Sequence, residues 1–267
     1  MTTSPSWDVD RYLRHGDHRA RPFHDLLARV GPLPSPAPRI VDLGCGAGNV
    51  TAVLAERWPS ARITGLDSSP AMLAAAAEYA GPTAGGGSLD FAYADAAAWT
   101  PDGPLDLLVS NAVLQWVPGH TARFPAWVAA LAPGGVFAFQ VPGNFDSPSH
   151  ALMRRVCASP RWRERLDGVL REDPVLSPAG YLAELVGLGC EVDAWETTYT
   201  HLLRGEDPVL DWVSGTGLRP VLDALGREAD TFVDEYRELL REAYPREAYG
   251  TVFPFRRIFV VARRTEG

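Results

Sequence analysis

The 267-residue chain is long enough for one large domain, and its 46% hydrophobic content is ample for a packed core. Its formal net charge of -8 argues against nucleic acid as a partner, because such partners need a basic surface, and favours a small-molecule ligand. The sequence shows neither an apolar run of about 18 residues nor a secretory pattern at its start, so we expect a cytoplasmic protein without a membrane partner. A monomer is compatible with these features.

Cysteine and histidine are too scattered for a disulfide framework or a metal site. The cysteines Cys45, Cys157 and Cys190 are odd in number and far apart, so we expect reduced thiols. The six histidines form no cluster with cysteine at ligand spacing, and we therefore expect no metal ion. All 25 residues counted as Lys or Arg are arginine, so any anion site in this chain has to use the bidentate guanidinium group.

Residues 39–143 alternate short apolar runs with Ala- and Leu-rich stretches, which is the pattern of a parallel sheet covered by helices on both faces. Helices are expected at 49–57 and 69–78, and the second has Ser69 as its N-cap and Pro70 at its first position. The strands are expected at 39–43, 62–66, 89–93, 105–109 and 136–141. This part of the sequence therefore predicts an α/β fold.

Beyond Pro142 the alternation weakens and helical stretches dominate. The expected elements are helices around 148–170, 178–188 and 206–244, and strands near 191–198 and 257–262. Two late strands that flank a long helical insertion indicate an antiparallel edge pair and a helical cap.

A glycine-rich loop follows the first strand. Asp42 is followed by Gly44, Gly46 and Gly48, and glycine permits both tight turns and close approach of the backbone to a ligand. The dinucleotide fingerprint needs a sixth-position glycine, where this chain has Asn49, so a NAD-linked oxidoreductase is the less favoured reading. S-adenosylmethionine (SAM) has no pyrophosphate and carries positive charge, so we expect it as the cofactor of this loop.

Acidic side chains at or after the carboxyl ends of the first three strands are expected to contact SAM. Asp42 is placed for the methionyl ammonium group, and Asp67 for the ribose hydroxyls, because a carboxylate offers two acceptor oxygens. Asp95 can accept the adenine amino group, although capping of a helix is the structural alternative. Met72 can cover the adenine face or simply fill the core. The remaining expected cofactor contacts are Ser68, Ala96 and Asn111.

Several strings outside the loop are specific. They are residues 110–118, 140–144, 147–150, 215–220 and 253–259, together with Trp7, Tyr12, 19–22 and Trp212. With these strings the chain resembles the trans-aconitate methyltransferase family from end to end. The resemblance implies a Rossmann-like class I methyltransferase fold, with a seven-stranded, mostly parallel sheet and helical cap insertions. We expect an N-terminal helical lid at 1–30, a SAM-binding core at 31–143, and the late strands with a substrate-binding cap at 144–267, within one structural domain.

The resemblance further implies methyl transfer from SAM to a carboxylate of trans-aconitate or a similar small polycarboxylate, giving a monomethyl ester. A carboxylate with a pKa of about 4 is already ionised at neutral pH, so we nominate no catalytic acid or base. Catalysis then consists of positioning the acceptor oxygen in line with the sulfonium in a site that excludes water. The alternatives are a methyltransferase for another small acid or a natural-product scaffold, and a SAM-binding regulator without activity.

Arginines are expected to hold the acceptor carboxylates that do not react, because a guanidinium on the attacking oxygen would lower its nucleophilicity. For each arginine the alternative is a solvated or ion-paired surface residue. Gln115 and Trp116 follow the fourth strand and should face the substrate, with the core as the alternative for Trp116. The arginine candidates are Arg219, then Arg257, and then Arg19 and Arg21 on the lid together with Tyr12.

Overall fold

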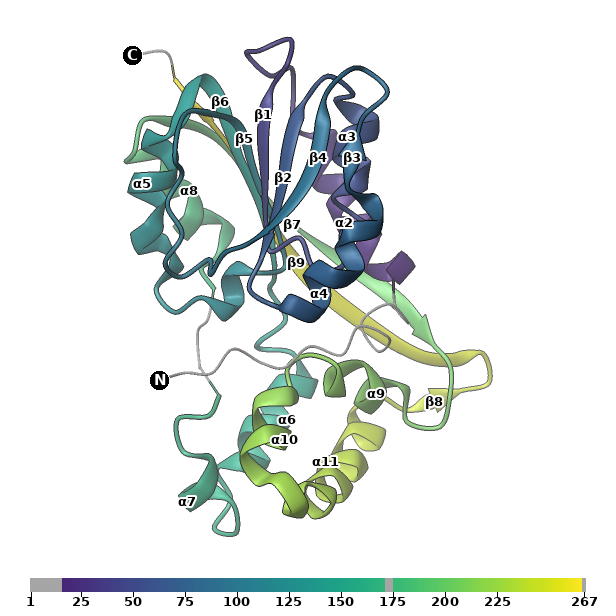
Figure 1. Cartoon of the computed structure of the whole chain (residues 1–267). Coiled ribbons are helices and arrows are strands. Elements are labelled where there is room, and N and C mark those ends of the chain that lie inside the picture. The colour runs from purple at the N-terminus through teal and green to yellow at the C-terminus, as the bar shows by residue number, and fades with distance from the viewer. Residues whose placement is uncertain (1–15, 171–174, 266–267) are drawn as a thin grey trace. The chain divides into compact units, whose positions relative to one another are not determined.

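The computed structural model describes residues 16–170 and 175–265, and the side chains from residue 20 onward (Figure 1). The strands are β1 (Arg39–Leu43), β2 (Arg62–Asp67), β3 (Gly81–Pro82), β4 (Ser88–Tyr93), β5 (Leu105–Asn111), β6 (Leu131–Pro142), β7 (Cys190–Leu203), β8 (Arg246–Glu247) and β9 (Gly250–Arg264). Their order in the sheet is β3-β4-β2-β1-β5-β6-β9-β7, and β8 pairs with β9. The neighbours β4, β2, β1, β5 and β6 run parallel, as the sequence predicts.

The described strands number nine, whereas the sequence analysis expected seven. The two additional strands, β3 and β8, contain two residues each and pair antiparallel with β4 and β9. Such short edge pairings are too small to leave an apolar run in the sequence. The expected class I fold is otherwise confirmed.

The chain divides into two compact units. We call residues 16–142, 175–197 and 258–265 the sheet unit, and residues 143–170 and 198–257 the helical unit. Both β7 and β9 contribute residues to each unit.

In the sheet unit, helices cover both faces of the sheet. Figure 1 shows α2 (Gly16–Ala28), α3 (Ala52–Arg57) and α4 (Pro70–Ala76) on one side, and α5 (Phe124–Ala129) and α8 (Pro178–Val186) on the other. Because both faces are covered, β1, β5 and β6 are apolar and buried over most of their length. The predicted cap of α4 is present, since Ser69 Oγ accepts a hydrogen bond from the Met72 amide at 3.4 Å.

The helical unit has a hydrophobic core of its own, which includes Trp212, Phe232, Tyr236 and Phe253. Its helices are α6 (Pro148–Cys157), α7 (Arg163–Leu166), α9 (Pro208–Ser214), α10 (Arg219–Leu225) and α11 (Ala229–Ala243). The helical stretches expected around 148–170 and 206–244 are therefore confirmed, and each is divided into separate helices. Gly226, with a left-handed φ of 54°, separates α10 from α11. Short 3-10 turns are η1 (Ala77–Tyr79), η2 (Leu114–Trp116), η3 (His120–Arg123) and η4 (Gly226–Glu228).

Candidate functional site

The glycine loop between β1 and α3 needs its glycines for conformation and for space. Gly44, Gly46 and Gly48 have φ values of 83°, 56° and 80°, in the left-handed region that side chains disfavour. A Cβ at Gly44 would collide with the side chain of Val113, which follows β5. The loop is held to the sheet because the amides of Gly44 and Cys45 both donate to the Leu66 carbonyl, at 2.7 and 2.9 Å. The sequence thus folds into a rigid backbone cradle at the carboxyl end of β1.

Asp67 joins this cradle to the start of α4. Its Oδ2 accepts from the Gly46 amide at 2.9 Å and its Oδ1 from the Ser69 amide at 2.8 Å. Each carboxylate oxygen can accept a further hydrogen bond, so the structural contacts leave capacity for two ligand hydroxyls. The predicted ribose contact is therefore compatible with the geometry.

Asp42 is a buried carboxyl group with one oxygen unused by the described residues. The residue is 1% exposed, and Oδ2 accepts from the Thr51 hydroxyl at 2.7 Å, whereas Oδ1 is buried without a hydrogen-bond partner there. Burial raises the pKa of Asp42 to about 7; the Thr51 hydrogen bond opposes the shift and the charge of Asp67 adds to it. Because an unsatisfied buried carboxylate is costly, this oxygen fits a cationic ligand group such as the methionyl ammonium.

Four other predicted cofactor positions follow the ends of β2 and β4. Met72 is 2% exposed, so its side chain fills the core of the sheet unit in this structure. Asp95 Oδ1 accepts from the Ala97 amide at 2.9 Å, but the described residues between β4 and β5 form a turn and no helix there, so the contact is not the helix cap named as its alternative role. Ser68 and Ala96 are half-buried. The cofactor roles of these four residues stay predictions.

The end of β5 and the segment after it carry the predicted cofactor contact Asn111 and the predicted substrate contacts Gln115 and Trp116. Asn111 Oδ1 accepts from the buried Gln140 side chain at 2.6 Å. Gln115 is 6% exposed, and its Nε2 donates to the Ala112 carbonyl at 2.5 Å. Trp116 is half-buried and thus not enclosed in the core. The β5–β6 register therefore fixes Asn111, while a local side-chain bond fixes Gln115.

The arginine candidates fall into different parts of the chain. Arg219 opens α10 and Arg257 lies in β9, both in the helical unit. Arg219 Nε is buried, has no hydrogen-bond acceptor among the described residues, and lies 3.7 Å from an Asp223 carboxylate oxygen. Arg257 is 5% exposed, with its guanidinium 4.9 Å from the Phe255 ring centroid.

The lid candidates are only partly described. Arg21, on α2, is exposed and lies 3.9 Å from Asp25. Arg19 lies on α2, but its side chain is outside the described residues, and Tyr12 is outside them entirely. The structure thus groups the cofactor candidates in the sheet unit, and Arg219 and Arg257 belong to the helical unit.

Three residues of the site were missed by the sequence analysis. Thr51 bonds to Asp42, Val113 packs over Gly44, and Gln140 bonds to Asn111. Gln140 left a signal, because a glutamine inside the apolar strand at 136–141 needs a partner when buried. Thr51 and Val113 left none, since both residue types are common at such positions.

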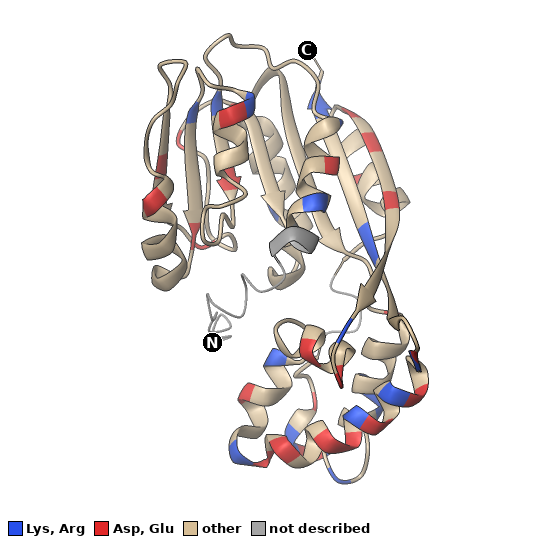
Figure 2. Ribbon diagram, turned by 90° about the vertical axis from the view of Figure 1, so that its right-hand side faces the viewer, with Lys and Arg blue, Asp and Glu red and all other residues tan. Residues whose placement is uncertain are grey.

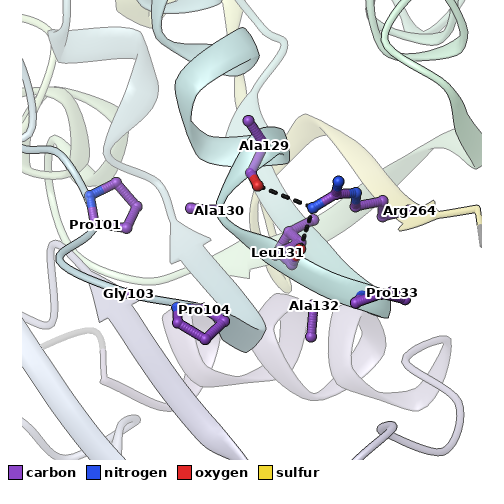
Figure 3. A pocket seen from close by; sticks show the side chains of 9 residues that line it. All are labelled: Pro101, Gly103, Pro104, Ala129, Ala130, Leu131, Ala132, Pro133 and Arg264. Carbon is purple, nitrogen blue, oxygen red and sulfur yellow. Dashed lines mark hydrogen bonds between the residues drawn. The ribbon is translucent and has the colours of Figure 1, made fainter. Parts of the chain in front are cut away.

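Two other features of the described residues carry no chemistry for this site. A hollow lined mainly by prolines and alanines lies at the amino ends of β5 and β6 (Figure 3). Because β1 runs parallel to β5, the glycine loop that follows β1 lies at the opposite end of these strands. The arginine of the hollow, Arg264, donates to the Ala129 and Leu131 carbonyls. Among residues 16–170 and 175–265, no group of three His, Cys, Asp or Glu side chains is placed to hold a metal ion.

The sheet order and the glycine cradle define a class I, SAM-dependent methyltransferase, and a family model described as a methyltransferase domain matches residues 40–135. The chain is 67% identical to a trans-aconitate 2-methyltransferase of Streptomyces coelicolor, over 99% of this chain and 89% of the relative. It is 69% identical to one of Streptomyces avermitilis, over 97% of both. The chain belongs to the trans-aconitate 2-methyltransferase family.

Solved structures confirm the fold at lower identity. A methyltransferase of Haloferax volcanii, solved with its activator Trm112, matches with a TM-score of 0.55 at 20% identity, over 97% of this chain and 95% of that one. Phosphoethanolamine N-methyltransferase 2 of Haemonchus contortus, solved with SAM, matches with a TM-score of 0.52 at 17% identity, over 92% of this chain and 53% of that one. The predicted fold, family and cofactor are therefore confirmed.

Proposed function

We propose that this methyltransferase transfers the methyl group of SAM to one carboxylate of trans-aconitate, or of a similar small polycarboxylate, and releases a monomethyl ester and S-adenosylhomocysteine. The observation that carries the proposal is the 67% identity, over 99% of the chain, to a relative named for this acceptor. The alternative is an enzyme of the same class that methylates another small acid or a natural-product scaffold.

SAM, when bound, supplies an electrophilic methyl group on a sulfonium. The cradle formed by Gly44, Gly46 and Gly48 brings the backbone close to it. Asp42 is proposed to pair with the methionyl ammonium and Asp67 with the ribose hydroxyls. Asn111 holds the methionyl part, and the remaining contacts, around adenine and ribose, come from Ser68, Met72, Asp95 and Ala96. The unused oxygen of Asp42 supports the first of these assignments.

The acceptor carboxylate needs no general base, because it is ionised at neutral pH. The chain's residues therefore orient the acceptor and exclude water, and we assign no catalytic acid or base. Arg219 and Arg257 are proposed to bind the carboxylates that do not react, which leaves the attacking oxygen free of a cation. The other substrate contacts are proposed to be Gln115, Trp116 and, from the N-terminal lid, Tyr12, Arg19 and Arg21.

We place the enzyme in the cytoplasm, with a small molecule as its partner rather than nucleic acid or membrane. The net charge of -8 argues against nucleic acid as a partner. The helical unit supports the same conclusion, because acidic and basic residues are interspersed along its helices (Figure 2). Among the described residues, no helix is both long and apolar enough to cross a membrane.

The test is a methyl-transfer assay with purified protein, SAM and a panel of acceptors. The panel contains trans-aconitate, other di- and tricarboxylates, a phenol and an amine. We expect ester formation with trans-aconitate and a slower rate with shorter diacids. Turnover of the phenol or the amine, with no turnover of any carboxylate, would overturn the proposal.

A further inference from the structure

A buried polar pair lies next to the loop that carries Gln115 and Trp116. His120 in η3 and Tyr181 in α8 are 4% and 0% exposed, and His120 Nε2 lies 2.8 Å from the Tyr181 hydroxyl. The second ring nitrogen, Nδ1, lies 3.3 Å from the carbonyl oxygen of Val117. Polar groups are costly in a core unless they are fully bonded, so a hydrogen-bonded pair of this kind fixes one geometry.

The direction of these hydrogen bonds follows from the chemistry of the partners. A carbonyl oxygen only accepts, so in the neutral imidazole Nδ1 carries the hydrogen and Nε2 accepts from the Tyr181 hydroxyl. The Leu176 backbone also hydrogen-bonds to that hydroxyl, while burial raises the pKa of Tyr181 well above its usual range and keeps its proton in place. A continuous chain of hydrogen bonds therefore joins Leu176, Tyr181, His120 and Val117.

The loop after β5 is fixed at two points. At its start Ala112 has a φ of 59°, which is unusual for a residue other than glycine, and its amide donates to the Gln140 carbonyl at 2.9 Å. At its end the Val117 carbonyl is held by His120. Gln115 and Trp116 lie between these points. A strained backbone that is held on both sides is typical of loops whose side chains must keep one orientation.

We propose that His120 and Tyr181 are positioning residues for methyl transfer, which hold Gln115 and Trp116 against the acceptor through the Val117 carbonyl. The inference rests on the proposed function, in which these two loop residues face the acceptor. In-line transfer is sensitive to geometry, and a misplacement of about 1 Å can lower the rate about 100-fold. If the pair served packing alone, phenylalanine would do as well, since Phe124 and Phe139 already surround Tyr181.

Three variants separate the hydrogen bonds from the packing. Tyr181→Phe keeps the ring and removes the hydroxyl, and His120→Phe removes both ring nitrogens. We expect each to lower kcat about tenfold or more, while the dissociation constant for SAM changes less than about twofold. His120→Asn keeps a donor near the position of Nδ1, so it should recover part of the kcat that His120→Phe loses.

The matched control is Trp127→Phe. Trp127 belongs to the same aromatic core, and its Nε1 donates to the Trp99 carbonyl at 3.3 Å, so this variant likewise loses a hydrogen bond and keeps an aromatic ring. We expect it to lower the melting temperature while kcat stays within about twofold. A kcat unchanged in Tyr181→Phe, equal losses of kcat and SAM affinity, or failure of Tyr181→Phe to fold would each assign the pair to packing. If the wild-type enzyme methylates no carboxylate, the proposed function is refuted and not the role of His120 and Tyr181. The variants are then compared with the wild type on the acceptor that the wild type does methylate.

Discussion

Lowering the pH from about 7 to about 5.5 should weaken SAM binding about 15-fold, because the Asp42 carboxyl takes up a proton in this interval. Burial raises the pKa of Asp42 to about 7, against the effect of the Thr51 hydrogen bond and with a further contribution from the charge of Asp67. A protonated Asp42 cannot pair with the methionyl ammonium, so the apparent dissociation constant follows the protonated fraction of the free enzyme. About half of the free enzyme has a protonated Asp42 at pH 7. At pH 5.5 only about 3% of the free enzyme still has an ionised Asp42.

Isothermal titration calorimetry measures this linkage in two ways. The dissociation constant is followed between about pH 5.5 and pH 7, below the range near pH 8 where the α-amino group of the ligand titrates. At pH 7, titrations in buffers of different ionisation enthalpy should show release of about half a proton for each SAM bound.

Asp42→Asn is the control, because it keeps the hydrogen-bonding shape and cannot ionise. We expect it to bind SAM more weakly than the wild type at pH 7, with a dissociation constant independent of pH in the same window. A wild-type profile as flat as that of the variant would refute the reasoning.

The raised pKa of Asp42 also affects folding of the ligand-free protein, because the folded state holds the proton more tightly than the unfolded state. The contribution of the protonated Asp42 to stability is therefore present below pH 3.8 and is lost as the pH rises through about 7.

Other variants test the remaining parts of the site. Arg219→Ala should raise the acceptor KM about tenfold or more and leave SAM binding nearly intact, whereas the exposed Arg155→Ala should change neither in steady-state kinetics. Asp67→Ala should weaken SAM binding and leave the acceptor KM nearly unchanged in the same assays. Unchanged SAM affinity in this variant would contradict the proposed contact between Asp67 and the ribose. Gly44→Ala should lower the melting temperature more than Gly119→Ala, because both have a left-handed φ but only at Gly44 would the new methyl group meet another side chain.

Local signals explain what the sequence predicts well. The runs at 39–43 and 62–66 are confirmed as β1 and β2, because strands covered on both faces are mainly apolar. Ser69 and Pro70 mark the start of α4 correctly, since capping depends only on neighbours in the chain. The loop at 44–48 was identifiable because glycine is the residue type that most readily adopts the left-handed backbone conformation at Gly44, Gly46 and Gly48.

Contacts that depend on register were beyond the sequence. Asn111 and Gln140 bond because they are partners in the β5–β6 ladder, and 29 positions separate them. The bond between His120 and Tyr181 likewise joins positions 61 residues apart. Such pairs depend on how whole strands and helices pack, so no local sequence pattern predicts them.

S-adenosylhomocysteine distinguishes the two charges that Asp42 could serve in SAM. The product keeps the methionyl ammonium and loses the positive sulfonium. If Asp42 pairs with the ammonium, the product should bind with the same dependence on pH as SAM, with a midpoint near the Asp42 pKa of about 7. If the sulfonium is the partner, the product profile should be flat while that of SAM is steep. The buried oxygen without a partner points to a hydrogen-bond donor, which an ammonium offers and a sulfonium does not, so we expect parallel profiles.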